Sequence, residues 1–366
     1  MNRSPRRADP PGALWILTLV CAQGFISACG VQGLPHPPRL EQPAEIKDLA
    51  LAQRGRTLEF TFSLPELAAD GERLTKPLEA EILRAPVAAD QAGPTAPGEL
   101  SLWKELRADD LARYQQGKKI VLPLTLSDEE FRQQHGGTFA FGARTLTRGF
   151  RHRAVESDPS NVVQVILVDV SLPVNDLKIQ AEEHALALSW SAPAQTMSGQ
   201  PATNISAYRI YRSPTGKPGS FQLRGEVSGQ EYRDAEFKFG RAYYYKVLAV
   251  SKQDGSVAES EESATVEITP RDVFPPAAPR GLTALYTTGV VDVIWTANSE
   301  PDLAGYSVYR REESGAAKQI SQDILRTPLF RDSSVAAGRK YFYRVTALDL
   351  ANNESPACEE VQVETR

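Results

Sequence analysis

The sequence predicts an all-β protein made of three β-sandwich domains in tandem, and three observations support this. A repeat with copies 98 residues apart fills the second half of the chain. Within each copy apolar and polar residues alternate, which is the period of a strand with one buried face. Glycine, proline, asparagine and serine separate these short runs, and no helical period of similar length occurs. Short strands with frequent turns are typical of antiparallel sandwiches.

The length and composition fit several folded domains and exclude some classes of protein. At 366 residues the chain is too long for one core, since single cores stop growing near about 250–300 residues. With 24% charged and 41% hydrophobic residues, it is neither disordered nor a multi-span membrane protein. The formal net charge is −5 and the basic residues form no stripe, so we expect no nucleic-acid partner.

Residues 1–28 are predicted to be an export signal. Arginines precede an apolar run, ALWILTLVCAQGFISA at 13–28, in the order typical of a secretory signal. The run is shorter than the roughly 20 apolar residues that a membrane-spanning helix needs. We therefore expect export with cleavage rather than a permanent transmembrane anchor.

The end of this run resembles the bacterial lipobox, in which a branched apolar residue and two small residues precede a cysteine that receives lipid. The matching residues are Ile26, Ser27, Ala28, Cys29 and Gly30. The resemblance implies a mature chain that begins at an acylated Cys29, whose acyl chains, palmitate among them, anchor it at about 0.8 kcal/mol per buried CH₂. Glycine rather than aspartate after the cysteine implies sorting to the outer membrane. The alternative is a plain secretory signal with an incidental cysteine.

Residues 29–42 are expected to form a proline-rich tether. The segment LPHPPRLEQP at 34–43 favours an extended chain of about 3.1 Å per residue. The start of the tether, CGVQGLPHPP at 29–38, is similar to that of small lipoproteins that assist the lipopolysaccharide translocon. An accessory role in outer-membrane assembly therefore remains a second hypothesis.

Only one thiol is expected in the mature chain. Cys21 leaves with the signal and Cys29 takes lipid, so Cys358 has no partner for an intramolecular disulfide. Odd spacing from Val361 and Val363 predicts that Cys358 lies off the core face of the last strand.

Residues 171–270 and 271–366 contain the clear copies of the repeat. Trp190 and Trp295 are 105 residues apart, so the loop that follows is seven residues longer in the first copy than the 98-residue spacing requires. Such length variation belongs in a surface loop. The segments at the 98-residue spacing are YRIYR at 208–212 and YSVYR at 306–310, YRD at 232–234 and FRD at 330–332, and GRAYYYKVLA at 240–249 and GRKYFYRVTA at 338–347.

Residues 43–170 are predicted to be a diverged third copy. Segment 80–86, AEILRAP, matches YRIYRSP at an offset of 128, whereas Phe139 matches Tyr243 at an offset of 104. The difference of 24 residues indicates an insertion within 87–135, where QAGPTAPG is expected to be a loop.

The insertion also contains helix signals. Ser127 and Glu130 have the spacing of a capping box, which predicts the start of a short helix. We also expect a short helix between Leu102 and Tyr114.

A tryptophan on an early strand, a tyrosine on a middle strand and a late Gly-x-x-Tyr-x-x-x-Val-x-Ala motif resemble the fibronectin type III domain. The resemblance covers about residues 43–366 and implies an immunoglobulin-like sandwich for each copy. It also implies that Tyr243 and Tyr341 form the tyrosine corner, in which the hydroxyl bonds to nearby backbone. The first copy departs from the pattern, with Phe62, Ala80 and Phe139 at the signature positions.

No residues have the spacing of a known catalytic or metal site. The four histidines form no pair with ligand spacing, and no HExxH, GxSxG, phosphate-binding or CxxC motif occurs. We therefore expect a protein that is not an enzyme, with no cofactor and no metal. Only the insertion leaves room for an unrecognised active site. The acidic run at Glu259, Glu261 and Glu262 is expected to be solvated surface charge.

Three tyrosines lie on the strand face opposite the predicted core and are candidates for a binding surface: Tyr211, Tyr244 and Tyr309. Exposed aromatic rings can stack on sugars or anchor a protein partner. The alternative is that neighbouring lysine and arginine stems cover these rings. Together these features predict a lipid-anchored protein of the outer membrane that displays its domains for protein or polysaccharide binding, or for scaffolding.

Overall fold

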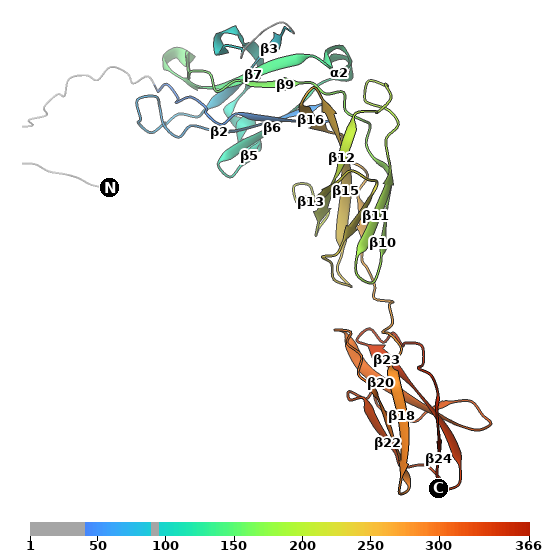
Figure 1. The fold of residues 1–366 in the computed structure, drawn as a ribbon. Coiled ribbons are helices and arrows are strands. Elements are labelled where there is room, and N and C mark those ends of the chain that lie inside the picture. The colour runs from blue at the N-terminus through green and yellow to red at the C-terminus, as the bar shows by residue number, and fades with distance from the viewer. Residues whose placement is uncertain (1–40, 89–94) are drawn as a thin grey trace, which may run out of the picture.

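In the computed structural model, which describes residues 41–88 and 95–366, the chain folds into three β-sandwiches in sequence order. We refer to them as module one (43–170), module two (171–270) and module three (271–366). Module one lies across one end of module two, and module three continues beyond the other end (Figure 1). Each module encloses its own cluster of buried apolar residues.

Module one has two antiparallel sheets. The first has the order β1 (Ala50–Arg54), β2 (Thr57–Ser63), β6 (Lys119–Thr125) and β5 (Gln115–Gln116). The second has the order β4 (Ser101–Leu106), β3 (Glu79–Val87), β7 (Thr138–Arg148) and β8 (Ala154–Glu156), with β9 (Val163–Ile166) also paired to β7. Phe60 and Phe141 meet edge to face between the sheets, with ring centroids 5.3 Å apart.

The insertion at 87–135 adds helices to module one: η1 (Pro97–Glu99), α1 (Ala108–Arg113) and α2 (Asp128–Gln134). Leu111 of α1 and Phe131 of α2 are buried in the core of the module. The capping box is confirmed, because Glu130 N donates to Ser127 Oγ and Ser127 N donates to the Glu130 carboxylate. The insertion is thus part of the folded module.

Module two repeats the two-sheet plan without the helices. One sheet has the order β10 (Asn175–Ala181), β11 (Leu186–Ser191) and β14 (Glu231–Asp234). The facing strands are β13 (Gln222–Val227), β12 (Ile205–Ser213), β15 (Tyr243–Gln253) and β16 (Ser256–Glu259), with β17 (Val266–Ile268) also paired to β15. The two sheets enclose one core that includes Trp190 and Tyr245.

Module three has the same strand order, except that none of its described strands corresponds to β16. One sheet contains β18 (Arg280–Thr287), β19 (Val290–Thr296) and β22 (Leu329–Asp332). The other contains β21 (Lys318–Gln319), β20 (Leu303–Glu312), β23 (Lys340–Asp349) and β24 (Val361–Glu364). The predicted fold class, tandem fibronectin type III-like sandwiches, is therefore confirmed.

The signature residues of modules two and three occupy the cores. Trp190 meets the ring of Tyr208 edge to face, with centroids 5.4 Å apart, and Trp295 and Tyr306 form the matching pair at 5.1 Å. Because the two contacts recur at equivalent positions, the periodic residues of the sequence mark the same packing in both modules.

The tyrosines of the late motif make the backbone contact that defines a tyrosine corner. Lys238 N donates to the hydroxyl of Tyr243 at 2.9 Å, and Ala336 N donates to that of Tyr341 at 3.0 Å. Phe139 occupies this position in module one and has no hydroxyl to accept such a bond.

The expectation for Cys358 was wrong. Its side chain is half-buried against the core of module three, and its Sγ accepts a hydrogen bond from Val345 N at 3.1 Å. Cys358 lies before the start of β24, in a segment without regular strand geometry, so strand parity counted from Val361 does not reach it. Burial raises the pKa of this thiol.

In the described part of the chain, no helix combines the length and the apolar character that a bilayer crossing requires. The predicted signal at 1–28 and most of the predicted tether lie outside the described residues.

Candidate functional site

The joint between modules one and two is the most elaborate polar site among the described residues. The hairpin of β15 and β16 in module two reaches module one, where β16 pairs with β1 in parallel through Arg54 and Glu259. Gly55 N also donates to the Glu259 carbonyl at 2.7 Å. Through this contact one sheet from each module joins into a single nine-stranded sheet.

Gln53 binds the connecting segment as a backbone strand would. Its amide nitrogen donates to the Val168 carbonyl at 2.8 Å, and its amide oxygen accepts from Val168 N at 2.9 Å. Gln53 is buried. Two hydrogen bonds to one residue in a dry environment fix both the position and the direction of the chain between the modules.

A small apolar cluster lies under these polar contacts. Val168 and Val170 of the connecting segment pack with Ala258 of β16 and with Met197 from a loop of module two. Met197 also packs against the core of module one. The joint therefore has an apolar centre, which excludes water from part of the polar network.

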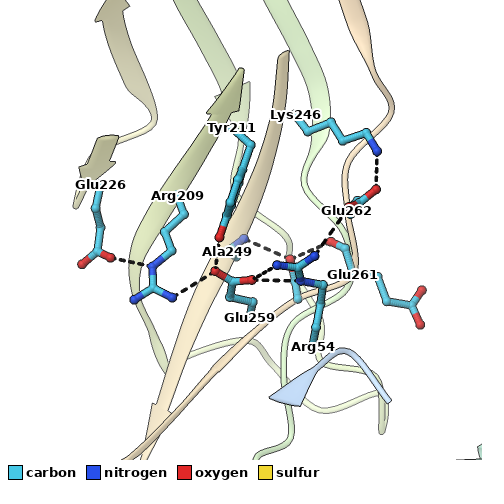
Figure 2. A network of polar contacts seen from close by, with 10 residues as sticks. Arg54, Arg209, Tyr211, Glu226, Lys246, Ala249, Glu259, Glu261 and Glu262 are labelled. Atoms are coloured by element: carbon cyan, nitrogen blue, oxygen red, sulfur yellow. Dashed lines mark hydrogen bonds and ion pairs between the residues drawn. The ribbon is translucent and has the colours of Figure 1, made fainter. Parts of the chain in front are cut away.

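Glu259 is the centre of that network (Figure 2). The residue is only 7% exposed. One carboxylate oxygen accepts from Arg54 of module one at 2.9 Å, and the other accepts from Arg209 at 2.9 Å and from the hydroxyl of Tyr211 at 2.6 Å. Glu259 thus connects two modules and three donors, and the expectation that it is solvated surface charge was wrong.

The surroundings of Glu259 keep it ionised. Burial opposes the charge, but hydrogen bonds from Tyr211 and Arg209 and the charge of Arg54 outweigh it and hold the pKa of Glu259 below its ordinary value of 4.5. In the opposite direction, burial and the hydrogen bond to Glu259 raise the pKa of Tyr211 to about 12. Both groups hold their present protonation states throughout the neutral range.

An outer ring of charges completes the network. Arg209 also pairs with Glu226 at 2.7 Å, Arg54 also approaches Glu262 at 3.7 Å, and Lys246 pairs with Glu262. The network thus contains three carboxylates and three cations, and its formal charge is zero. Because these charges neutralise one another, the arrangement suits a fixed joint better than an ion-binding site.

A cavity of about 270 Å³ lies beside the network. The side chains around it include Tyr211, Phe221, Leu248 and Lys246. The ammonium of Lys246 stands 4.4 Å from the ring centroid of Phe221, and the guanidinium of Arg54 stands 5.7 Å from that of Tyr211. Both aromatic faces therefore already have a cation against them.

The three candidate surface tyrosines do not form one patch. Tyr211 pairs across the sheet with Lys246, two residues from Tyr244, so Tyr211 and Tyr244 share the outer face of module two. Tyr309 lies in module three. Each hydroxyl donates to a carboxylate: those of Glu259, Glu267 and Glu354 respectively. Their role in binding a sugar or a protein stays a prediction.

A group of carboxylates that no sequence pattern indicated lies where module three begins. Single side-chain oxygens of Asp272, Asp302 and Asp349 lie within 4.8 Å of one another. Asp349 is buried, and its oxygens accept hydrogen bonds from the backbone and side chain of Asn353. These residues are 30 and 47 positions apart in the chain, so no local motif could have revealed them.

The predicted lipidation residue Cys29 and its neighbours Ile26, Ser27, Ala28 and Gly30 lie outside the described residues.

No protein family model matches the sequence. Among curated proteins, Exoglucanase B of Cellulomonas fimi is 28% identical over 184 residues, which is 49% of this chain and 15% of that protein. Chitinase A1 of Niallia circulans is 24% identical over 200 residues, 53% of this chain and 26% of the chitinase. Amylopullulanase of Thermoanaerobacterium saccharolyticum is 36% identical over 87 residues, 23% of this chain and 6% of that protein. The chain thus spans about a quarter or less of the length of these relatives.

The similar solved structures include the chicken CNTN1 FN1–FN3 domains, which are 14% identical with a TM-score of 0.27. That similarity covers 88% of this chain and 99% of the other.

Proposed function

We propose that the chain is a lipid-anchored cell-envelope protein of the outer membrane whose modules bind or scaffold other molecules without catalysing a reaction. The observation that carries the proposal is the joint around Glu259. A charge-neutral network around the buried Glu259 and a shared sheet hold module one and module two at a fixed angle. A rigid pair of sandwiches is well suited to presenting a surface at a set distance from an anchor.

The anchor itself is proposed from the sequence. The segment from Ile26 to Gly30 resembles a lipobox, and the tether at 29–42 would lift module one from the lipid. We expect mass spectrometry of the protein purified from its host to find an acylated Cys29 as the first residue. A Cys29→Ser variant should appear in the soluble fraction. A chain that starts elsewhere, or an unmodified Cys29 in the membrane fraction, would contradict the anchor.

Polysaccharide is the first class of partner to test. Parts of the chain are similar to parts of proteins named exoglucanase, amylopullulanase and chitinase. We expect the folded modules to sediment with at least one insoluble glucan or chitin and to release no sugar from it. Sugar release would overturn the non-catalytic proposal, and failure to sediment with any of them would favour a protein partner.

The alternative role in outer-membrane assembly rests on residues 29–38. It predicts that replacing residues 30–38 by an unrelated spacer of equal length causes an envelope defect while Cys29 remains acylated. Normal lipopolysaccharide export in that variant would remove this alternative. Protease treatment of intact cells tests whether the modules face the cell exterior, because the protease can cleave them only if they face outward.

A further inference from the structure

Module one presents an exposed aromatic and basic turn at the end remote from module two. The turn lies between β7 and β8 and includes the short helix η2 (Phe150–His152). Phe150 is 79% exposed, the largest exposed fraction among the large hydrophobic residues of the described chain. Arg151, His152 and Arg153 follow it directly, and all three are exposed.

The arginines at this turn differ in whether they form an ion pair. Arg148, at its base, pairs with Glu79 at 2.5 Å. Neither Arg151 nor Arg153 forms an ion pair with any residue of the described chain, and the guanidinium of Arg151 lies 5.4 Å from the ring centroid of Phe150. The turn therefore presents two open arginines, that is, arginines without an ion pair in the described chain, beside one highly exposed aromatic ring.

The backbone holds the turn in an unusual shape. Arg151 and His152 have φ angles of 55° and 59°, in the left-handed region that residues other than glycine seldom adopt. Two such residues in succession are a strained solution for a turn. The corresponding turn in module two uses Asp254 and Gly255, the pair that suits a tight hairpin.

The equivalent hairpin of module two, formed by β15 and β16, makes a contact outside its own module. There the β15–β16 hairpin docks on the preceding module through Glu259. Module one has no preceding module among the described residues; instead, the hydroxyl of Thr147 donates to the Glu41 carbonyl at 2.6 Å, where the described chain begins. The turn therefore lies beside the point at which the N-terminal segment enters module one.

The length of β7 places the turn at the end of module one where the N-terminal segment enters, far from module two. Gly136, just before β7, lies next to Gln253 of module two, and the eleven residues of β7 then span about 33 Å to the opposite end. Eleven residues lie between Cys29 and Glu41, so a proline-rich tether of twelve steps at about 3.1 Å each reaches about 37 Å. If Cys29 is in the bilayer, Phe150 can reach the bilayer surface.

We infer that this turn, which we call the 149–153 turn, is a second membrane contact: Phe150 inserts among lipid headgroups while Arg151 and Arg153 bind their anionic phosphates. The inference rests on the lipid anchor of the proposed function for its geometry. An exposed ring flanked by open arginines has the chemistry of an interfacial contact with anionic lipid. The partner is thus the membrane that holds the anchor.

The test measures binding of an unlipidated chain to vesicles, so that it does not depend on acylation of Cys29. The three cores consist of residues from Ile46 onward, so a chain of residues 30–366 keeps every core contact. We expect it to sediment with vesicles that contain 30% phosphatidylglycerol, and not with pure phosphatidylcholine vesicles. Phe150→Ala should weaken binding about tenfold, and Arg151→Ser or Arg153→Ser about fivefold each.

Matched controls come from module three. Leu350 is 75% exposed, and Arg280 and Arg326 are exposed without an ion pair in the described chain. Leu350→Ala and the pair Arg280→Ser with Arg326→Ser should change vesicle binding less than twofold. Binding equal to wild type in Phe150→Ala, or equal binding to both kinds of vesicle, would overturn the inference. Failure of the lipid anchor would instead appear in the mass of the N-terminal residue, which this assay does not involve.

Discussion

Glu259 illustrates how one buried side chain can decide the geometry between two domains. Its carboxylate accepts from Arg54 in one module and from Arg209 and Tyr211 in the other. The cost of removing such a charge from water is offset only while all partners remain in place. The residue therefore acts as a fixed point of the joint.

The substitution Glu259→Gln should destabilise this joint. It removes the charge that neutralises two arginines, and we expect a loss of about 1–3 kcal/mol in the free energy of unfolding of modules one and two. The measurement is urea unfolding followed by tryptophan fluorescence. The control is Glu226→Gln, at the exposed rim of the same network, which should cost less than about 0.5 kcal/mol. Equal effects of the two substitutions would show that burial of Glu259 adds nothing.

The same carboxylate predicts a pH dependence. The pKa of Glu259 in the folded state lies below its ordinary value of 4.5, so its contribution to stability is complete above that value. As the pH falls through the lowered folded pKa, the folded state must take up a proton and this contribution is lost. We expect the stability difference between wild type and Glu259→Gln to shrink between pH 5 and pH 3 (about two pH units). A difference that stays constant over this range would contradict the prediction.

At the scale of elements, modules two and three differ on the outer face of the three-stranded sheet. In module three Ile294 of β19 pairs with Leu329 of β22, and both are about half exposed. The equivalent pair of module two is Ser189 with Glu231. The register is the same at this pair, so the two modules differ here in the side chains that face solvent.

Exchanging these outer residues should leave the fold intact. Ile294→Ser and Leu329→Glu give module three the residues of module two, and we expect each to change stability by less than about 0.5 kcal/mol. Val293→Ala, one residue away on the buried face, should cost about 1–3 kcal/mol because it opens a cavity. Thermal unfolding of the three variants tests this. A loss in Leu329→Glu as large as in Val293→Ala would mean that the outer face is packed rather than free.

At the scale of the whole molecule, the two joints differ in kind. Modules one and two share a sheet and the network around the buried Glu259, whereas no strand pairing links modules two and three among the described residues. The contacts at the second joint include Phe239 of module two against Phe274 of module three, with ring centroids 6.1 Å apart. The first joint is thus fixed by more interactions than the second.

This difference predicts unequal motion of the modules. Spin labels at exposed Lys104 and Glu183 should give a narrow distance distribution between modules one and two, and labels at Glu183 and Gln322 should give a broader one across the second joint. Pulsed electron spin resonance measures both, with Cys358→Ser as the background. Gln53→Ala should broaden the first distribution, because it removes both hydrogen bonds to Val168. A first distribution as broad as the second would contradict a fixed first joint.

The sequence by itself determined the number of modules, their fold and their core residues. The signature residues recur because each sandwich must fill the same interior: Trp190 has its equivalent 105 residues later, and Tyr243 has its equivalent 98 residues later. The alternation of apolar and polar residues along a strand shows which residues face that interior. The insertion at 87–135 was also visible, since a change of offset measures length. The helices of this insertion could be predicted only in part, because the positions of Leu111 and Phe131 depend on packing in the core of module one.

Only the tertiary structure decided what happens between modules. Glu259, in a run of glutamates, has the local pattern of a solvated residue, and its burial comes from Arg54, which is 205 positions away in the chain. Gln53, Val168 and the three aspartates at the start of module three likewise meet across long separations. The periodicity of a strand shows on which face of its own sheet a residue lies, whereas contacts between domains depend on how the surfaces of two folded domains pack together. For that reason the cores could be predicted from the sequence, and the joint could not.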